Sequence, residues 1–364
     1  SNKLDGTGTI VLNAVPGNPV TAYIQTSAGA TLTQAPDHTI SGIGRIYALL
    51  VNDGTIRADV NGQALELLSA AKSNGGLMTA VNGATLLFNG IPITQDSGGI
   101  IRADNGTVLL HSASITGGTL QGISGGQIST NPGTGSALAD CTSEGALNIA
   151  ANSSLSIYSP GLTQNGLFTI NPTAADATTY LQYQQSGLLA GTGELVLNAS
   201  ANLATAYIET ASSDTILTHA AGHTISGSGR IHASILNQGL IRANQPGRTL
   251  ELLSRPKTNS NLMLASSGGT LYVNGFLLTQ TPTGILRASG GFIRLQSATV
   301  SGGAIESLNS GLATTIAGTG TVLDATTISG PFDIVANSNL SITNSLSHSG
   351  ILTINPEAIS ATTY

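Results

Sequence analysis

An internal duplication that spans almost the whole chain constrains the fold more than any other feature. Thr39–Ile46 (TISGIGRI) returns as Thr224–Ile231 (TISGSGRI), at an offset of 185 residues. Further matches at the same offset are Leu65–Leu68 with Leu250–Leu253 and Ile100–Ala103 with Ile285–Ala288. Matches at an offset of 184 are Thr169–Pro172 with Thr353–Pro356 and Ala177–Tyr180 with Ala361–Tyr364. We therefore predict two tandem units, 1-180 and 181-364, with one net deletion in the second and with a longer array as their context.

A finer period lies inside each unit. Short segments of a small residue, Thr and an apolar residue recur at Gly8–Ile10, Ala30–Leu32, Gly54–Ile56, Ala84–Leu86 and Gly106–Val108. Their apolar residues are 22, 24, 30 and 22 positions apart. Around them apolar and polar residues alternate with a period of two, and Gly, Asn and Asp interrupt the runs, as expected for short strands. No stretch keeps helical spacing for three turns, so we expect almost no helix.

Many short strands in coils of about 20–30 residues are typical of a solenoid, in which stacked coils bury one another's apolar faces. We predict an all-β fold, a right-handed parallel β-helix (β-solenoid) that runs continuously through both units. A β-sandwich array is the competing architecture, because Asn61-Gly62, Asn82-Gly83 and Asn105-Gly106 are also typical of hairpin turns. The same dipeptides suit solenoid corners, and few aromatic residues are available for a sandwich core, so we favour the solenoid.

Composition excludes several classes of protein. Only 8% of the 364 residues are charged, whereas 40% are hydrophobic, so the chain does not have the composition of a disordered segment. No window holds the ~20 apolar residues of a membrane span, so we expect no membrane insertion. A net charge of -6 with few Lys and Arg argues against nucleic acid as a partner. The single cysteine, Cys141, excludes an internal disulfide framework.

One sequence pattern, present in both copies, resembles that of a known group of proteins. Ile40–Ile46 (ISGIGRI) is followed by Leu50–Ala58 (LVNDGTIRA), and Ile225–Ile231 (ISGSGRI) by Ile235–Ala243 (ILNQGLIRA). This pattern resembles the repeat segments of autotransporter passengers and filamentous-haemagglutinin-like β-helical adhesins. The resemblance implies a right-handed β-helix exported to the bacterial cell surface or secreted beyond it.

Recurring arginines are the candidate ligand-binding residues. They form three pairs across the two copies: Arg45 and Arg230, Arg57 and Arg242, Arg102 and Arg287. Together with Glu66/Glu251 and Lys72/Lys257, they are expected on the outside, in coil-to-coil ion pairs that contribute little to stability at exposed sites. The alternative is an anion-binding stripe for acidic glycans, because guanidinium groups suit carboxylate or sulfate.

No catalytic, metal or cofactor site is predicted. Asp140 recurs as Asp324, but neither has a nearby carboxylate that also recurs, so the sequence shows no carboxylate pair of a glycan-cleaving enzyme, and a pair assembled from successive coils stays the alternative. His38 and His223 recur without a shared acidic neighbour, and Cys141 aligns with Ala325, which indicates a small buried residue. The recurring pairs Tyr23/Tyr207 and Tyr180/Tyr364 indicate packing at corners or unit junctions. Single Thr residues at strand starts are too irregularly spaced for an ice-binding lattice.

These observations favour a non-catalytic structural or adhesive stalk of a large repetitive bacterial protein, at the cell surface or outside the cell. Cell-surface glycans or neighbouring cells are the expected partners, and the ends of the solenoid could associate with one another. The alternatives are a β-helix module that binds or cleaves glycans and a self-associating matrix protein. An enzyme or glycan-binding module would differ by gathering acidic or aromatic residues that do not recur on one face, and none is apparent in the sequence.

Overall fold

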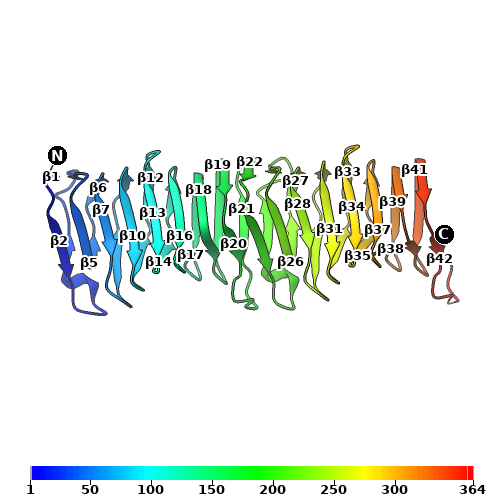
Figure 1. The fold of residues 1–364 in the computed structure, drawn as a ribbon, viewed down its shortest axis with the longest axis horizontal. Coiled ribbons are helices and arrows are strands. Elements are labelled where there is room, and N and C mark those ends of the chain that lie inside the picture. Colours follow the sequence, from blue (N-terminus) through cyan, green and yellow to red (C-terminus); the bar gives the residue numbers. More distant parts are fainter. Residues whose placement is uncertain (1, 359, 364) are drawn as a thin grey trace. The chain divides into compact units, whose positions relative to one another are not determined.

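The computed structural model describes residues 2–358 and 360–363. Contacts divide the chain into two compact units, Ser1–Thr173 and Ala174–Tyr364. Each unit is a parallel β-solenoid, in which successive coils place their strands side by side (Figure 1). The predicted repeat boundary after residue 180 falls at the start of β21 (Tyr180–Tyr183) and stays a prediction, and Tyr364 lies outside the described residues.

In the first unit the strands form three parallel stacks. The first stack is β2 (Thr9–Asn13), β7 (Thr55–Ala58), β10 (Leu77–Val81), β13 (Ile100–Asp104) and β16 (Thr119–Ile123). The second stack is β3 (Tyr23–Ile24), β8 (Ala64–Leu68), β11 (Thr85–Asn89), β14 (Thr107–His111), β17 (Gln127–Thr130) and β20 (Leu167–Ile170). The third stack is β1 (Asn2–Leu4), β4 (Thr31–Gln34), β6 (Leu49–Asn52), β9 (Lys72–Asn74), β12 (Pro92–Gln95) and β15 (Ser114–Thr116). The strands that bend through more than one stack are β5 (Thr39–Ile46), β18 (Gly135–Ile149) and β19 (Ser154–Gln164).

The second unit repeats this arrangement. Its first stack is β23 (Glu194–Asn198), β28 (Leu240–Ala243), β31 (Leu262–Ser266), β34 (Ile285–Ser289) and β37 (Ala304–Leu308). Its second stack is β21, β24 (Tyr207–Thr210), β29 (Thr249–Leu253), β32 (Thr270–Asn274), β35 (Phe292–Gln296), β38 (Leu312–Thr315), β40 (Phe332–Ile334) and β42 (Leu352–Ile354). Its third stack is β22 (Gly187–Ala190), β25 (Ile216–His219), β27 (Ser234–Asn237), β30 (Lys257–Asn259), β33 (Leu277–Gln280) and β36 (Thr299–Ser301). The bending strands are β26 (Thr224–His232), β39 (Gly320–Ser329) and β41 (Asn339–Ser349).

The strand pairing confirms the predicted fold class. The pairings described are parallel, apart from one isolated antiparallel bridge between Val15 and Asn18, so a hairpin-based sandwich is excluded. Helix is limited, among the described residues, to the short 3-10 turns η1 (Pro19–Thr21) and η2 (Leu203–Thr205). The predicted right-handed winding stays a prediction.

Coil length agrees with the sequence, but the finer period does not follow one face. Register partners Ile56, Met78, Ile101 and Leu120 show coils of 22, 23 and 19 residues in the first stack. The recurring apolar residues, in contrast, belong to different stacks: Ile10 to the first, Leu32 to the third and Leu86 to the second. The sequence pattern therefore predicts the length of a coil but not which stack each strand belongs to, because the strands of all three stacks use the same alternation.

The TISGxGRI motif is explained by the bend between two stacks. Its first half lies in the first stack and its second half in the second stack, within β5 and again within β26. The bend brings Gly42 so close to the preceding coil that a Cβ would lie 2.1 Å from the carbonyl oxygen of Leu12, at a φ of +104°. Gly227 repeats this against Leu197, also at 2.1 Å and at +101°. Only glycine fits there.

Polar ladders run inside the core of both units. The Asn52 amide donates to Asn74 (2.7 Å), and the Asn74 amide donates to Gln95 (3.0 Å), all three buried in the third stack. The second unit has the same ladder through Asn237, Asn259 and Gln280, at 2.8 and 3.0 Å. The central amides, Asn74 and Asn259, each accept from the preceding coil and donate to the following coil, whereas the buried Asn52 Oδ1 accepts no hydrogen bond among the described residues. The donor bonds along the ladder pair buried amides of successive coils and fix their register.

Candidate functional site

The six candidate arginines do not share one face. Arg45 and Arg230 lie in the second stack, whereas the other four lie in the first stack at β7, β13, β28 and β34. All six have partners within the protein. The ion pairs are Arg45 with Glu66 (2.6 Å), Arg57 with Asp59 (3.1 Å), Arg230 with Glu251 (2.7 Å), Arg242 with Glu194 (3.6 Å) and Arg287 with Glu306 (2.6 Å). Arg102 donates to Gln121 (2.8 Å). Ligand binding by these arginines stays a prediction.

Coil-to-coil pairing of the recurring charges is confirmed for several of them, but the expectation that all lie outside is wrong. Glu66 and Glu251 are only 4% and 5% exposed. Each is enclosed by the arginine of the preceding coil and by an Asn of the following coil, Asn89 at 2.6 Å and Asn274 at 2.8 Å. These glutamates therefore organise the second stack as buried, fully bonded acceptors.

Lys72 and Lys257 are core residues. Each side chain enters the interior of the third stack, where its ammonium donates to two carbonyl oxygens of the preceding corner. Lys72 reaches Leu68 (3.2 Å) and Ala70 (2.6 Å), and Lys257 reaches Leu253 (3.0 Å) and Arg255 (2.9 Å). Burial lowers the pKa of Lys72 to about 8, and burial together with Arg255 lowers the pKa of Lys257 to about 7. Sequence reasoning placed them outside because an isolated lysine is normally exposed.

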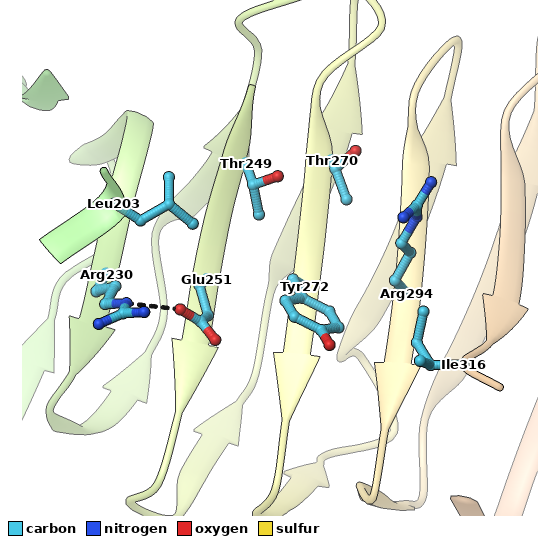
Figure 2. Close-up of a pocket in the computed structure, with 8 residues that line it drawn as sticks. All are labelled: Leu203, Arg230, Thr249, Glu251, Thr270, Tyr272, Arg294 and Ile316. Carbon is cyan, nitrogen blue, oxygen red and sulfur yellow. Dashed lines mark hydrogen bonds and ion pairs between the residues drawn. The ribbon is translucent and has the colours of Figure 1, made fainter. Parts of the chain in front are cut away.

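The second stack of the second unit carries a groove. A hollow of about 410 Å³ is lined by Leu203, Arg230, Thr249, Glu251, Thr270, Tyr272, Arg294 and Ile316. Figure 2 shows Arg230 bonded to Glu251, with Tyr272 and Arg294 on the next two strands. These four residues are register neighbours on β26, β29, β32 and β35, so their side chains point to the same side.

A second hollow continues the first along the same stack. It has a volume of about 490 Å³ and shares Arg294 and Ile316 with the first. Its other lining residues include Phe292, Thr314 and Asp333 on β35, β38 and β40, and Pro356 and Glu357 after β42. We call the two hollows together the groove.

Four groove residues differ from their counterparts in the first unit. At the fixed offset of 185, Tyr272, Phe292, Arg294 and Asp333 replace Leu87, Thr107, Leu109 and Asn148. Arg294 is exposed, and among the described residues its side chain has no hydrogen-bond or ion-pair partner. The expectation that no aromatic or acidic residues unique to one copy gather on one face is therefore wrong. The sequence does not reveal them by recurrence, because these four positions differ between the two copies.

Electrostatics link the groove residues. Burial, followed by the charge of Glu251, raises the pKa of Tyr272, and Arg294 opposes that shift. Arg230 also donates to the Tyr207 hydroxyl (3.1 Å) and lies 5.9 Å from the centre of that ring. Tyr207 thus orients an arginine, and its counterpart Tyr23 packs edge-on against Tyr47 at 5.8 Å, in keeping with the predicted packing roles.

The predicted match of Asp140 with Asp324 is wrong by one residue. Ala139 pairs with Thr116, and Asp324 pairs with Ser301, the counterpart of Thr116. Asp140 therefore corresponds to Ala325, and these two residues share a positive φ of 54° and 48° at a bulge. The deletion lies later, between Tyr158 and Leu162, whose counterparts are Thr343 and Leu346.

Cys141 then corresponds to Thr326. The Cys141 thiol donates to Ile115 and Ala139, and the Thr326 hydroxyl donates to Val300 and Asp324, at equivalent backbone positions. The predicted small, buried role of Cys141 is confirmed, and burial raises the pKa of its thiol to about 12. A thiol with this pKa is a poor nucleophile at neutral pH.

His223 belongs to a buried pair that the sequence did not suggest. Its Nδ1 lies 3.0 Å from His219 Nε2, and His219 Nδ1 lies 2.7 Å from Asn237 Oδ1 at the start of the polar ladder. In the first unit Gln34 occupies the position of His219, beside His38. The pair thus caps the ladder. Its signal in the sequence was the unusual spacing of two histidines four residues apart.

The described residues contain no cluster of three or more His, Cys, Asp or Glu side chains that could hold a metal ion. Within the same residues, no helix has the length and apolar character needed to cross a membrane. No protein-family model matches the chain, and no curated protein sequence matches it.

Among solved structures, the chain is similar to a TibC-catalysed, hyper-glycosylated fragment of TibA. The similarity covers 94% of this chain and 99% of that chain, at 13% identity and a TM-score of 0.29. At this TM-score the similarity adds nothing to the fold given by the strand pairing, and it assigns no function.

Proposed function

We propose that this chain is a non-catalytic structural segment, a stalk, of a repetitive bacterial protein at the cell surface or outside the cell. The observation that supports the proposal is that the features shared by the two units are those that hold successive coils together. Both units retain the buried apolar faces, the Asn–Asn–Gln ladder, the core lysine and the Arg–Glu pair. These residues hold coil on coil, and tandem repetition of a unit devoted to stacking adds length to a solenoid.

The carboxylates give less support to a glycan-cleaving enzyme. Hydrogen bonds from Ser301, Asn344 and Thr343 lower the pKa of the half-buried Asp324 carboxyl, so it is held ionised. Glycoside hydrolysis needs one carboxyl with a raised pKa as the acid and a second, ionised carboxylate. Burial raises the pKa of Glu209, but this carboxylate accepts a hydrogen bond from Gln182 (2.8 Å). Glu251 in the groove is occupied by Arg230 and Asn274.

Adhesion to cell-surface glycans or neighbouring cells, and end-to-end self-association, remain proposals for the parent protein. Unpaired strand edges at a coil end favour self-association.

The experiment that tests the stalk is the addition of a third copy of the unit. Maximum dimension measured by small-angle X-ray scattering should grow by the same increment from one to two and from two to three units. A two-unit chain and a three-unit chain of equal maximum dimension would contradict the proposal. Incubation with a panel of polysaccharides should release no products, and the release of oligosaccharides would overturn the non-catalytic assignment.

A further inference from the structure

Arg294 is the only groove arginine that the fold itself does not use. Arg230 is held by Glu251 and Tyr207, and thereby joins its own coil to the coils before and after it. Arg294 has no such bond among the described residues, and its position is a leucine in the first unit, which has the same fold without it. An exposed guanidinium with free donors, set where two hollows meet, is a binding group for an anion.

Aromatic rings flank this guanidinium. Tyr272 is its register neighbour on β32, and Phe292 lies two residues before it on β35, where alternate residues share one side of a strand. Phe292 is 39% exposed although it is a large apolar side chain. Planar rings beside a cation, one on the neighbouring strand and one on its own strand, suit a ligand that has flat C–H faces and carries a negative charge.

The polar lining extends these contacts along the stack. Thr249 and Thr270 present hydroxyls, the Thr314 hydroxyl donates to the Thr315 carbonyl oxygen and keeps its acceptor side, and Asp333 and Glu357 present carboxylates at the far end of the groove. Adjacent strands are ~4.8 Å apart, so the groove offers polar groups at regular intervals across several coils. Its backbone groups are already used in the parallel ladders, so a peptide could not add as a further strand. The contacts are therefore those of side chains with hydroxyls and an acid.

We propose that this groove binds a linear acidic polysaccharide through a uronate residue. The uronate carboxylate pairs with the Arg294 guanidinium, the pyranose rings pack on Tyr272 and Phe292, and the threonines and Asp333 bond the sugar hydroxyls. Arginine matches a carboxylate with two parallel hydrogen bonds, which favours uronate as the acidic group. The site goes beyond the stalk function and belongs to the second unit alone, not to the six recurring arginines.

The test is isothermal titration calorimetry of the whole chain with a linear oligogalacturonate and with a neutral oligogalactose of the same length. The wild type should bind the uronate at least tenfold more tightly, and added salt should weaken binding because the attraction is between charges. Arg294→Leu and Tyr272→Leu, which copy the first unit and therefore suit the fold, should each weaken binding about tenfold or more. Arg57→Leu removes the same charge outside the groove and should leave binding unchanged.

Several outcomes would overturn the proposal. These are no binding of the uronate, equal binding of the neutral sugar, equal binding of a sulfated oligosaccharide or an acidic peptide, and unchanged binding by Arg294→Leu. A loss of binding in Arg57→Leu equal to that in Arg294→Leu would point instead to the recurring arginines. None of these outcomes depends on how length grows with the number of units, so the site and the stalk are tested separately.

Discussion

The buried histidine pair makes the stability of the second unit sensitive to acid. The Asn237 amide nitrogen donates to Asn259, so Asn237 Oδ1 faces His219 and accepts from Nδ1–H. His219 Nε2 is then an acceptor and takes the Nδ1–H of His223, at 3.0 Å. Both rings are neutral in this arrangement. Protonation of His219 would turn its Nε2 into a donor that faces another donor.

The pKa shifts give the sign and size of the effect. Burial lowers the pKa of His219 from 6.5 to about 4, and burial with the nearby His219 lowers the pKa of His223 to about 3. The unfolded state thus binds more protons below pH 6.5, so the free energy of unfolding falls as the pH falls from 6.5 to about 4. A shift from 6.5 to about 4 corresponds to about 3 kcal/mol for His219, at ~1.36 kcal/mol per pH unit.

His219→Gln is the matched substitution, because Gln34 already fills this position in the first unit. There its amide nitrogen donates to the carbonyl oxygens of His38 (2.7 Å) and Thr55 (2.9 Å). Urea unfolding followed by circular dichroism should show that the free energy of unfolding of the wild type falls, relative to the variant, by about 3 kcal/mol from pH 7 to pH 4. His348→Gln, at an exposed histidine, serves as the control and should follow the wild type. Parallel pH profiles of wild type and His219→Gln would refute the reasoning.

Three further perturbations follow from the core. Gly227→Ala should lower the free energy of unfolding in urea by more than ~3 kcal/mol, because the new Cβ would meet the Leu197 carbonyl oxygen and the φ of residue 227 is positive. The control Gly320→Ala, which has open space around it, should change the free energy of unfolding little. Equal effects of the two substitutions would contradict the close approach. Asn259→Leu leaves the Asn237 donor and the Gln280 acceptor unpaired, so it should lower the free energy of unfolding by about 2–5 kcal/mol. If the ladder is coupled, the loss in the Asn259→Leu, Gln280→Leu double variant is substantially smaller than the sum of the losses in the two single variants. The pKa of Lys257 is lowered from 10.5 to about 7, so between these two pH values the unfolded state binds one proton more than the folded state. The free energy of unfolding of the wild type, measured relative to Lys257→Met, should therefore rise from pH 7 to pH 10. A difference that does not change with pH would show that Lys257 stays charged in the folded chain.

The fold class followed from the sequence because its signals are local and repeated. Alternation of apolar and polar residues, with Gly and Asn at the breaks, predicts strands and corners, and the repeat at 185 residues shows that one solution is used twice. The TISGxGRI motif is recognisable in the sequence because it recurs, but the need for its glycines is explained only by the tertiary structure. Only the neighbouring coil shows why Gly42 and Gly227 tolerate no side chain.

The candidate site could be predicted only in part. Recurrence led to Arg45 and Arg230, and these arginines proved to be partners of buried glutamates. The groove instead uses Tyr272, Phe292, Arg294 and Asp333, which are up to 61 positions apart (272 to 333) and break the repeat. Nothing in a linear pattern says that such positions share a face, because coil lengths vary and shift the spacing.

The sequence by itself determined that the chain forms short strands in coils of about 20–30 residues, in two copies of one unit, since strand alternation and turn residues depend on neighbours along the chain. The tertiary structure decided which residue lies above which. Stacking of coils placed the lysines inside, aligned the Asn and Gln amides, moved the match of Asp140 by one residue and brought the groove residues together. These are contacts across the stack, where a change of one residue in a coil alters every partner, and so they depend on the register of the coils.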